Sequence, residues 1–442
     1  MVRSDNAAVM RLKQWQWHEK RCQIVVTGVE SGARAVYEIG GEACRLHGNN
    51  ECELHHWFEG EQEHVIAVEE LHDGKGQVVG QCAVYSLHDD LLELVPLKGN
   101  FHMHSEATKG YYASVRYLLE NCRSVGFDFM TLTDRMQREP SILAAADYEK
   151  GLLGLGVFPG EELVAPGTTI RIVSFGAWAG IAPELADTTA FNTAVECKIK
   201  GWGLLPAGVD ARAYAATVLC CERIRALGGL SILCHPQWIG SESYAESVRD
   251  GYFDIAVPLM DHLMRTRPFD ALELLGGYNV HEAWLKSQQV VRWCEKHLRG
   301  REIPAVGTGD GGPRNNDYFA RYHTIVWSPS DSVSGIVASV KACRCVAVDV
   351  WPGLSSGMIW DYNASMPERL PQPKVYGPAR LEKLAQFLLR EVYPHHDDLC
   401  LEEAYLISSY MGGYYDYGIK KARRLSRHVR AYMDACRGMA GI

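Results

Sequence analysis

Histidine and carboxylate residues stand at or near the ends of five short apolar segments in the middle of the chain. The segments are GNFHMH, FMTLTD, VFPGEE, LSILCHP and IPAVGTGD, and they carry His102, His104, Asp134, Glu161, Glu162, His235 and Asp310. Imidazoles combined with carboxylates are ligands that suit Zn, Mn and Fe. These residues can act together only if the fold brings the five segment ends to one place.

His102 and His104 are separated by a single residue. Side chains alternate along an extended strand, so these two imidazoles should point to the same side. Such a pair also occurs on ordinary polar strands. Because further ligand-type residues follow at later segment ends, the sequence favours a shared metal site.

The elements that would position these residues repeat one simple unit. Residues 112–125 place apolar side chains on one helical face and stop at Gly126, before the apolar segment FDFMTLT. A helix that ends at Gly228 precedes LSILCHP, and another that ends at Gly300 precedes IPAVGTGD. Helix, glycine and apolar strand in succession predict a parallel α/β barrel or sheet, whose carboxyl strand ends surround the ligand site.

Three regions with different patterns divide the chain. Residues 1–96 contain short alternating runs separated by turn residues and predict a small all-β, sandwich-like domain. Residues 97–355 carry the helix–strand units, and residues 356–442 indicate a helical region packed on the barrel. In the first region the adjacent His55 and His56 should face opposite sides of a strand, so they cannot share a metal.

The composition indicates a globular protein and disfavours a nucleic-acid-binding surface, although it leaves room for a local basic pocket. The 442 residues include 54 acidic and 45 basic ones, for a net charge of −9, whereas nucleic-acid surfaces need clustered Lys and Arg. No stretch approaches the roughly 20 apolar residues that cross a bilayer, and the N-terminus does not resemble a signal peptide. The 14 Cys show no paired framework and suit a reduced, cytoplasmic protein. A homo-oligomer is compatible with this composition.

The order and spacing of these residues resemble the PHP (polymerase and histidinol phosphatase) phosphoesterase domain, in its amidohydrolase-like branch. The similarity extends over residues 99–350 and rests on HMHS at 102–105, TDR at 133–135, PGEE at 159–162, HP at 235–236 and DGG at 310–312. The resemblance implies a distorted (β/α)7-type barrel and metal-dependent hydrolysis of phosphoesters. Members of this branch also hydrolyse amides and carbamates.

The resemblance also implies which residues hold divalent metal, one or two ions of Zn, Mn or Fe. The first ion would be bound by His102, His104, Glu162 and Asp310. A second would share Glu162 and use His235. The family's other ligand positions are occupied here by Lys109, Arg135, Arg171 and Gly312. The resemblance therefore implies that the second site is incomplete and that a third site has lost its ligands.

Lys109, Arg135 and Arg171 place positive charge where the family has metal ligands. An arginine stays protonated and cannot bind a metal. These cations would either hold an anionic group of the substrate, phosphate or carboxylate, or form ion pairs with Glu161, Asp134 or a neighbouring acid. Both interpretations remain open from the sequence.

Arg135, Arg171 and Asp134 are the candidate catalytic residues. The arginines would stabilise charge on phosphoryl oxygens in the transition state. Asp134 would accept a proton or orient a ligand, or would instead bond to the backbone.

Two functions fit this pattern. The first is a metal-dependent hydrolase, a phosphoesterase that attacks a small anionic substrate with metal-activated water. The alternative is a catalytically degenerate protein of the same fold that binds an anionic or sugar ligand without hydrolysing it. A nucleotide-binding loop at GTGDGG is excluded because no convincing helix follows it.

Overall fold

The computed structural model describes most of the first 350 residues and a short segment near residue 380. The described ranges are 1–13, 22–47, 51–148, 154–236, 255–276, 289–291, 293–294, 302–310, 322–350 and 372–394. The chain forms two compact units, Met1–Leu94 and Val95–Ile442. Most of the predicted helical region at 356–442 lies outside the described residues.

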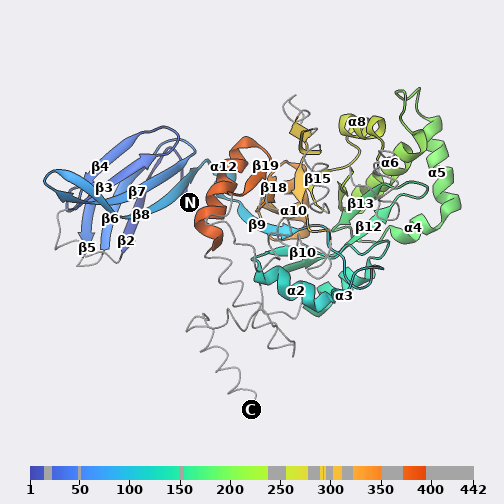
Figure 1. Ribbon diagram of the computed structural model, residues 1–442, viewed down its shortest axis with the longest axis horizontal. Coiled ribbons are helices and arrows are strands. Elements are labelled where there is room, and N and C mark those ends of the chain that lie inside the picture. The colour runs from blue at the N-terminus through green and yellow to red at the C-terminus, as the bar shows by residue number, and fades with distance from the viewer. Residues whose placement is uncertain are drawn as a thin grey trace, which may run out of the picture. The chain divides into compact units, whose positions relative to one another are not determined.

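The first unit consists of two sheets (Figure 1). The larger follows the order β1-β8-β7-β3-β4 and the smaller the order β2-β6-β5. The strands are β1 (Val2–Arg3), β2 (Asn6–Lys13), β3 (Cys22–Gly28), β4 (Arg34–Glu38), β5 (Cys44–His47), β6 (Glu51–Phe58), β7 (Glu63–His72) and β8 (Lys75–Leu87), and the short helix α1 (Asp89–Leu92) follows them.

Alternating burial explains how these two sheets pack. On β6, Cys52, Leu54 and Phe58 are buried, while the residues between them are partly or fully exposed. One apolar cluster joins residues of β3, β5, β6 and β7, so the inner faces of the two sheets share a core. His55 is exposed and His56 is half-buried, which agrees with their expected placement on opposite sides of the strand.

The second unit is a mixed α/β structure with two larger sheets. Their orders are β11-β10-β9-β17-β18-β19 and β12-β13-β14-β15-β16. The strands are β9 (Val95–Asn100), β10 (Phe129–Thr131), β11 (Gly156–Phe158), β12 (Gly160–Val164), β13 (Arg171–Phe175), β14 (Leu230–Leu233), β15 (Ala271–Leu275), β16 (Ala305–Gly307), β17 (Tyr322–Ser328), β18 (Cys345–Asp349) and β19 (Lys374–Tyr376).

Helices alternate with many of these strands, as predicted from the segments that end at Gly126 and Gly228, whereas most of the helix predicted to end at Gly300 lies outside the described residues. The helices are α2 (Val115–Ser124), α3 (Glu139–Tyr148), α4 (Ala182–Ala186), α5 (Thr188–Lys200), α6 (Ala211–Ala226), α8 (Val257–Thr266), α10 (Val333–Lys341), α12 (Ala379–Phe387) and the π-helix η3 (Leu388–Val392). α6 shows why the local sequence is helical. The Asp210 carboxylate accepts hydrogen bonds from the backbone N–H groups of Arg212 and Ala213, and Gly228 follows the helix with a left-handed backbone.

The expectation of an all-parallel arrangement is wrong for part of the second unit. β9, β10 and β11 pair in parallel, as do β14, β15 and β16. β12 and β13 are antiparallel because residues 165–170, which join them, are too few for a crossover. β13 with β14, β9 with β17, β17 with β18 and β18 with β19 are also antiparallel.

The predicted (β/α)7-type barrel appears as two separate sheets, and no continuous strand ladder closes them among the described residues. One link between the sheets comes from a side chain. Thr324 Oγ1 on β17 accepts a hydrogen bond from Gly307 N on β16 and donates one to Gly307 O, with lengths of 3.0 and 2.9 Å. These two hydrogen bonds hold the end of β16 against β17.

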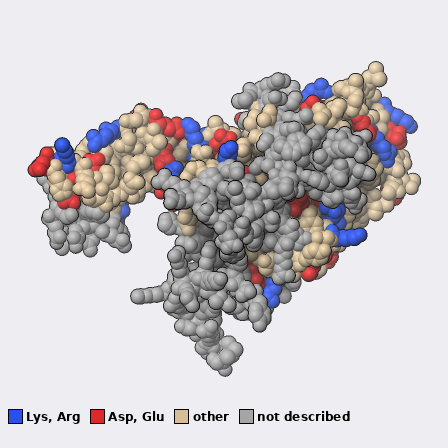
Figure 2. Space-filling model, in the orientation of Figure 1, with Lys and Arg blue, Asp and Glu red and all other residues tan. Residues whose placement is uncertain are grey.

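Among the described residues, no helix is long and apolar enough to cross a bilayer. Figure 2 shows acidic and basic side chains interspersed on the visible face of the described residues, without a continuous basic area there.

Replacing Gly307 with Ala tests the close approach of β16 to β17. A Cβ at this position would lie 2.5 Å from the backbone oxygen of His323, which cannot move without its strand. We expect Gly307→Ala to lower the free energy of unfolding by about 1–3 kcal/mol, seen as a lower urea midpoint.

Gly203→Ala is the matched control. A Cβ there meets nothing within 4 Å, so the urea midpoint should stay unchanged. Equal midpoints for the two variants would contradict tight packing at Gly307.

Candidate metal centre

The segment after β9 and the segment after β16 are fastened to each other by Asn100. Its side-chain oxygen accepts hydrogen bonds from the backbone N–H groups of His102, at 3.0 Å, and Gly309, at 3.3 Å. Asp310 follows with a φ of +41°, in the left-handed region that an aspartate tolerates better than most residues. These bonds place the histidine pair beside Asp310.

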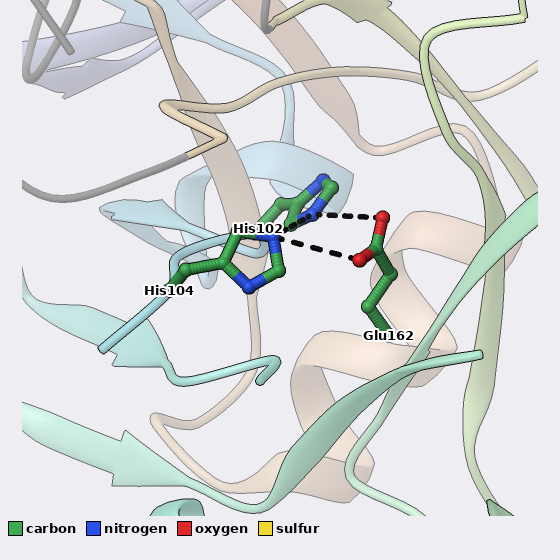
Figure 3. Close-up of side chains that lie close together, drawn as sticks. All are labelled: His102, His104 and Glu162. Atoms are coloured by element: carbon green, nitrogen blue, oxygen red, sulfur yellow. Dashed lines mark hydrogen bonds and ion pairs between the residues drawn. The ribbon is translucent and has the colours of Figure 1, made fainter. Parts of the chain in front are cut away.

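The side chains of His102 and His104 point toward Glu162 on β12 (Figure 3). The two Nε2 atoms are 3.2 Å apart. His102 Nε2 lies 3.7 Å from Glu162 Oε1, and His104 Nε2 lies 3.6 Å from Glu162 Oε2. Asp310 Oδ1 completes the group, at 3.3 Å from His102 Nε2 and 3.4 Å from His104 Nε2.

His235, which follows β14, approaches the same point. Its Nε2 lies 3.8 Å from Glu162 Oε1 and 3.8 Å from Asp310 Oδ2, and its ring stacks against His102 with centroids 5.8 Å apart. All five predicted metal-binding residues therefore meet, although they come from four separate segments of the chain.

The donor set fits a small divalent cation. Two ligand atoms about 2.1 Å from one ion, at a tetrahedral angle, lie about 3.4 Å from each other, and the separations here are 3.2–3.8 Å. His102, His104 and Glu162 form one group that could hold a metal, and His102, His235 and Asp310 form another. Glu162 Oε1 is buried and has no hydrogen-bond partner among the described residues, as expected for an atom that awaits a cation.

Glu273 on β15 belongs to this centre, although the sequence reasoning did not find it. It is fully buried, and its carboxylate lies 3.3 Å from His102 Nδ1. The carboxylate also accepts a 3.0 Å hydrogen bond from the backbone N of His235 and one from Thr308 Oγ1. The available signal was a single glutamate inside the apolar strand ALELL, since a buried carboxylate requires partners.

Thr108 fixes the orientation of the second histidine. Its hydroxyl donates to Asp134 Oδ1 at 2.7 Å, so it can only accept at its 3.2 Å contact with His104 Nδ1. His104 therefore carries a proton on Nδ1. When neutral it presents a lone pair on Nε2, as His102 does when Nδ1 donates to Glu273.

Asp134 contacts the candidate ligand His104 only indirectly, through the Thr108 hydroxyl. Its carboxylate accepts hydrogen bonds from Ser105 N at 2.8 Å, from Ser105 Oγ at 2.7 Å and from Thr108 Oγ1. This geometry corresponds to the orienting and backbone-bonding roles that the sequence left open. It does not direct the carboxylate at the shared centre.

The two arginines pair with Glu162, a neighbouring acid, rather than with Glu161 or Asp134. Arg135 Nε donates a 2.9 Å hydrogen bond to Glu162 Oε2, and Arg171 Nη1 lies 3.8 Å from Glu162 Oε1. Glu161 faces away and accepts hydrogen bonds from the backbone N–H groups of Ile181 and Ala182, at the start of α4.

Lys109 does not contribute to the geometry of the centre. Lys109 is exposed, and no contact places it at the centre. Gly312 lies outside the described residues.

Burial and opposite charges shift the ionisation of the whole group. Burial lowers the pKa of His102, but Glu273 and Asp310 outweigh it, so the net pKa is raised well above the ordinary value. Burial raises the pKa of Glu162, yet the adjacent imidazoles of His235, His104 and His102, together with Arg171, bring it well below the ordinary value. For Asp310 the adjacent imidazoles likewise outweigh burial and lower the pKa. The carboxylates are thus held in the anionic form that binds metal.

Tyr111 is a second residue that the sequence reasoning missed. Its ring packs on His104 with centroids 4.6 Å apart. Burial, followed by the charges of Asp310 and Glu162, raises the pKa of its hydroxyl. The Tyr111 side chain is therefore uncharged, lines the centre beside His104 and can donate a hydrogen bond.

Comparisons with known proteins give no family assignment. No protein-family model matches the chain, and no curated protein matches it. Structural matches include a putative metal-dependent phosphoesterase from Bifidobacterium adolescentis, with 15% identity, a TM-score of 0.33 and coverage of 49% of this chain and 88% of that one.

Two further matches are equally distant. An amidohydrolase from Chromobacterium violaceum, solved with bound sulfate and no metal, has 12% identity and a TM-score of 0.31, over 49% of this chain and 89% of that one. The lesion-specific endonuclease Q of Pyrococcus furiosus has 13% identity and a TM-score of 0.30, over 56% of each chain. Scores this low identify neither a shared fold nor a shared function, so the geometry of the centre carries the argument.

Replacing Glu273 with Gln tests its role in orienting the imidazoles. The glutamine side chain has the same shape as glutamate. However, its NH2 group is itself a donor and would face groups that now donate hydrogen bonds to the carboxylate, namely His102 Nδ1, the backbone N of His235 and Thr308 Oγ1. We expect affinity for a divalent metal to fall about 10–100-fold, measured by competition with a chromophoric chelator.

Glu161→Gln is the matched control, since this carboxylate lies next to Glu162 but faces α4. Its metal affinity should equal that of the unmodified protein. A folded Glu273→Gln variant with unchanged affinity would show that Glu273 does not act through the imidazoles.

Proposed function

We propose that this chain is a metal-dependent hydrolase, a phosphoesterase that acts on a small anionic substrate. The observation that carries the proposal is that two imidazoles lie between two carboxylates. The Nε2 atoms of His102 and His104 are 3.2 Å apart, and each lies 3.3–3.7 Å from an oxygen of Glu162 and from one of Asp310. His235 Nε2 lies 3.8 Å from both carboxylates. Three imidazoles and two carboxylates would be costly to bury together unless a cation joined them.

His102, His104, Glu162 and Asp310 would hold one ion, and His235 would complete its surroundings. A divalent ion in this place supplies a Lewis acid and lowers the pKa of bound water toward neutrality. Zn, Mn and Fe all suit nitrogen and carboxylate ligands. The resembled family has a further metal ligand where this chain has Arg171. The set of ligands for a second ion is therefore incomplete here.

The residues of the chain have separate tasks in this proposal. Glu273 and Thr108 hold the Nδ1 protons of the two histidines and keep both Nε2 atoms turned inward. Asp134 holds Thr108 in place. Tyr111 covers His104 and limits the access of water from that side.

Arg135 and Arg171 supply the positive field for an anionic substrate. Their side chains are 33% and 19% exposed, whereas their shared partner Glu162 is fully buried. Each arginine side chain is therefore partly accessible to solvent beside the buried carboxylate. From there it can contact phosphoryl oxygens and stabilise charge that develops on them.

The ion pair between Arg135 and Glu162 also supports a second candidate function. At 2.9 Å, Arg135 directly engages a proposed metal ligand and could replace part of the charge of a lost ion. A protein of this kind would bind an anionic or sugar ligand without cleaving it.

Metal content and hydrolysis separate the two functions. We expect near-stoichiometric Zn, Mn or Fe by elemental analysis, and metal-dependent release of product from a screen of phosphate mono- and diesters that includes a DNA oligonucleotide. Asp310→Ala should lose the metal and reduce kcat/KM at least about 100-fold, because it removes a ligand of the water-activating ion.

His55→Ala, which changes an exposed histidine of the first unit, should retain both metal and activity. Metal-free protein that binds phosphate esters but cleaves none of them would favour the binding function. Preferred cleavage of the oligonucleotide would exclude the small substrate.

Removing the arginine charges tests the anion subsite. Arg171→Met and Arg135→Met should each raise the KM for an anionic phosphate ester about 10-fold or more and weaken competitive inhibition by inorganic phosphate, because a charge-assisted hydrogen bond is lost.

Arg223→Met, which changes an exposed arginine paired with Glu184, is the control and should leave both constants unchanged. If phosphate inhibits all four proteins equally, the arginines serve only as partners of Glu162.

A further inference from the structure

The core of the first unit contains two cysteines whose sulfur atoms touch. Cys44 is the first residue of β5, and Cys52 lies on β6. Both are fully buried, and both belong to the cluster that fills the space between the two sheets.

The pairing of β5 with β6 explains why these two side chains meet. Cys44 stands opposite Leu54 and Cys52 opposite Leu46, so the cysteines are diagonal neighbours on the same inner face. Their Sγ atoms are 2.6 Å apart. Non-bonded heavy atoms prefer about 3.5–4.0 Å, so these thiols are closer than ordinary packing brings two atoms.

The close contact suits a two-step exchange with a disulfide. Either thiol can donate the hydrogen bond within the pair. Loss of one proton gives a thiolate that can attack an oxidant, and the neighbouring thiol lies within reach to resolve the mixed disulfide.

The position of β5 gives an oxidant a route to these buried atoms. Among the described strands, β5 lies at the edge of the three-stranded sheet, next to β6. Edge strands open locally at lower cost than central ones, and the pair is also accessible before the core closes during folding.

We propose that Cys44 and Cys52 form a disulfide that ties β5 to β6. A small-molecule disulfide such as oxidised glutathione is the oxidant. The thiolate of one cysteine attacks one glutathione sulfur and releases the first glutathione thiolate. The other cysteine, after losing its proton, attacks the cysteine sulfur of this mixed disulfide and releases the second glutathione thiolate. One S–S bond is broken and one is formed, and the two cysteine protons end on two molecules of glutathione.

The sequence makes the linkage easy to detect in the full-length protein. Arg45 lies between the two cysteines, so trypsin separates them into residues 35–45 and 46–75. After exposure to oxidised glutathione, denaturation and alkylation with N-ethylmaleimide, we expect two fewer adducts than the 14 cysteines allow. The two tryptic peptides should appear as one linked species that dithiothreitol separates.

Cys22 provides the control because it lies in the same core on β3. A Cys22→Ala variant should give the same linked peptides, whereas Cys52→Ala should give none and leave Cys44 alkylated or joined to glutathione. Reduction should lower the thermal midpoint of the unmodified protein by several degrees and leave that of Cys52→Ala unchanged.

Alkylation of all 14 cysteines at high ratios of oxidised to reduced glutathione would overturn the proposal. A linked peptide that contains Cys22 in place of Cys44 or Cys52 would overturn it as well. The peptide map requires only that the unmodified chain can be purified, so it does not depend on the stability of any variant.

Discussion

Three carboxylates and three imidazoles are buried together in the second unit, and this concentration of charge constrains the structure around it. Glu162, Glu273 and Asp310 would repel one another if no positive groups lay between them. His102 lies at hydrogen-bond or ion-pair distance from all three. Removing one partner from such a buried group leaves an uncompensated charge and typically costs about 3–5 kcal/mol. The arrangement is therefore both a strong candidate for binding a cation and a vulnerable part of the fold.

The residues behind the ligand atoms explain how this group keeps its geometry. Asn100 ties the histidine segment to the segment of Asp310, and Thr324 holds β16 against β17. Glu273 and Thr108 each occupy one ring nitrogen and leave the other turned toward the centre. A site held on strand ends by such bonds is preorganised, so little ordering remains to be done when a ligand binds.

The arginines supply positive charge beside the candidate metal centre. Arg135 and Arg171 both lie at ion-pair distance from Glu162, one of the proposed metal ligands. A guanidinium supplies a permanent positive charge and directed hydrogen bonds, but it cannot activate water. In the proposed function, catalysis would depend on the ion that His102, His104 and Asp310 would help to hold, and the arginines would bind the substrate.

The sequence by itself determined which residue types stand at the strand ends, because imidazole and carboxylate side chains after apolar segments are visible without coordinates. It also indicated a β-rich first unit and alternating helices and strands in the second. The sequence did not determine strand direction or barrel closure. The strands of an antiparallel hairpin such as β12–β13 and the strands joined by a parallel crossover both appear in the sequence as short apolar segments. Glu273, Thr108, Tyr111 and the Cys44–Cys52 contact came only from the tertiary structure. Their partners are supplied by other segments or across strands, and hydrogen bonding between such residues follows from three-dimensional packing rather than from spacing along the chain.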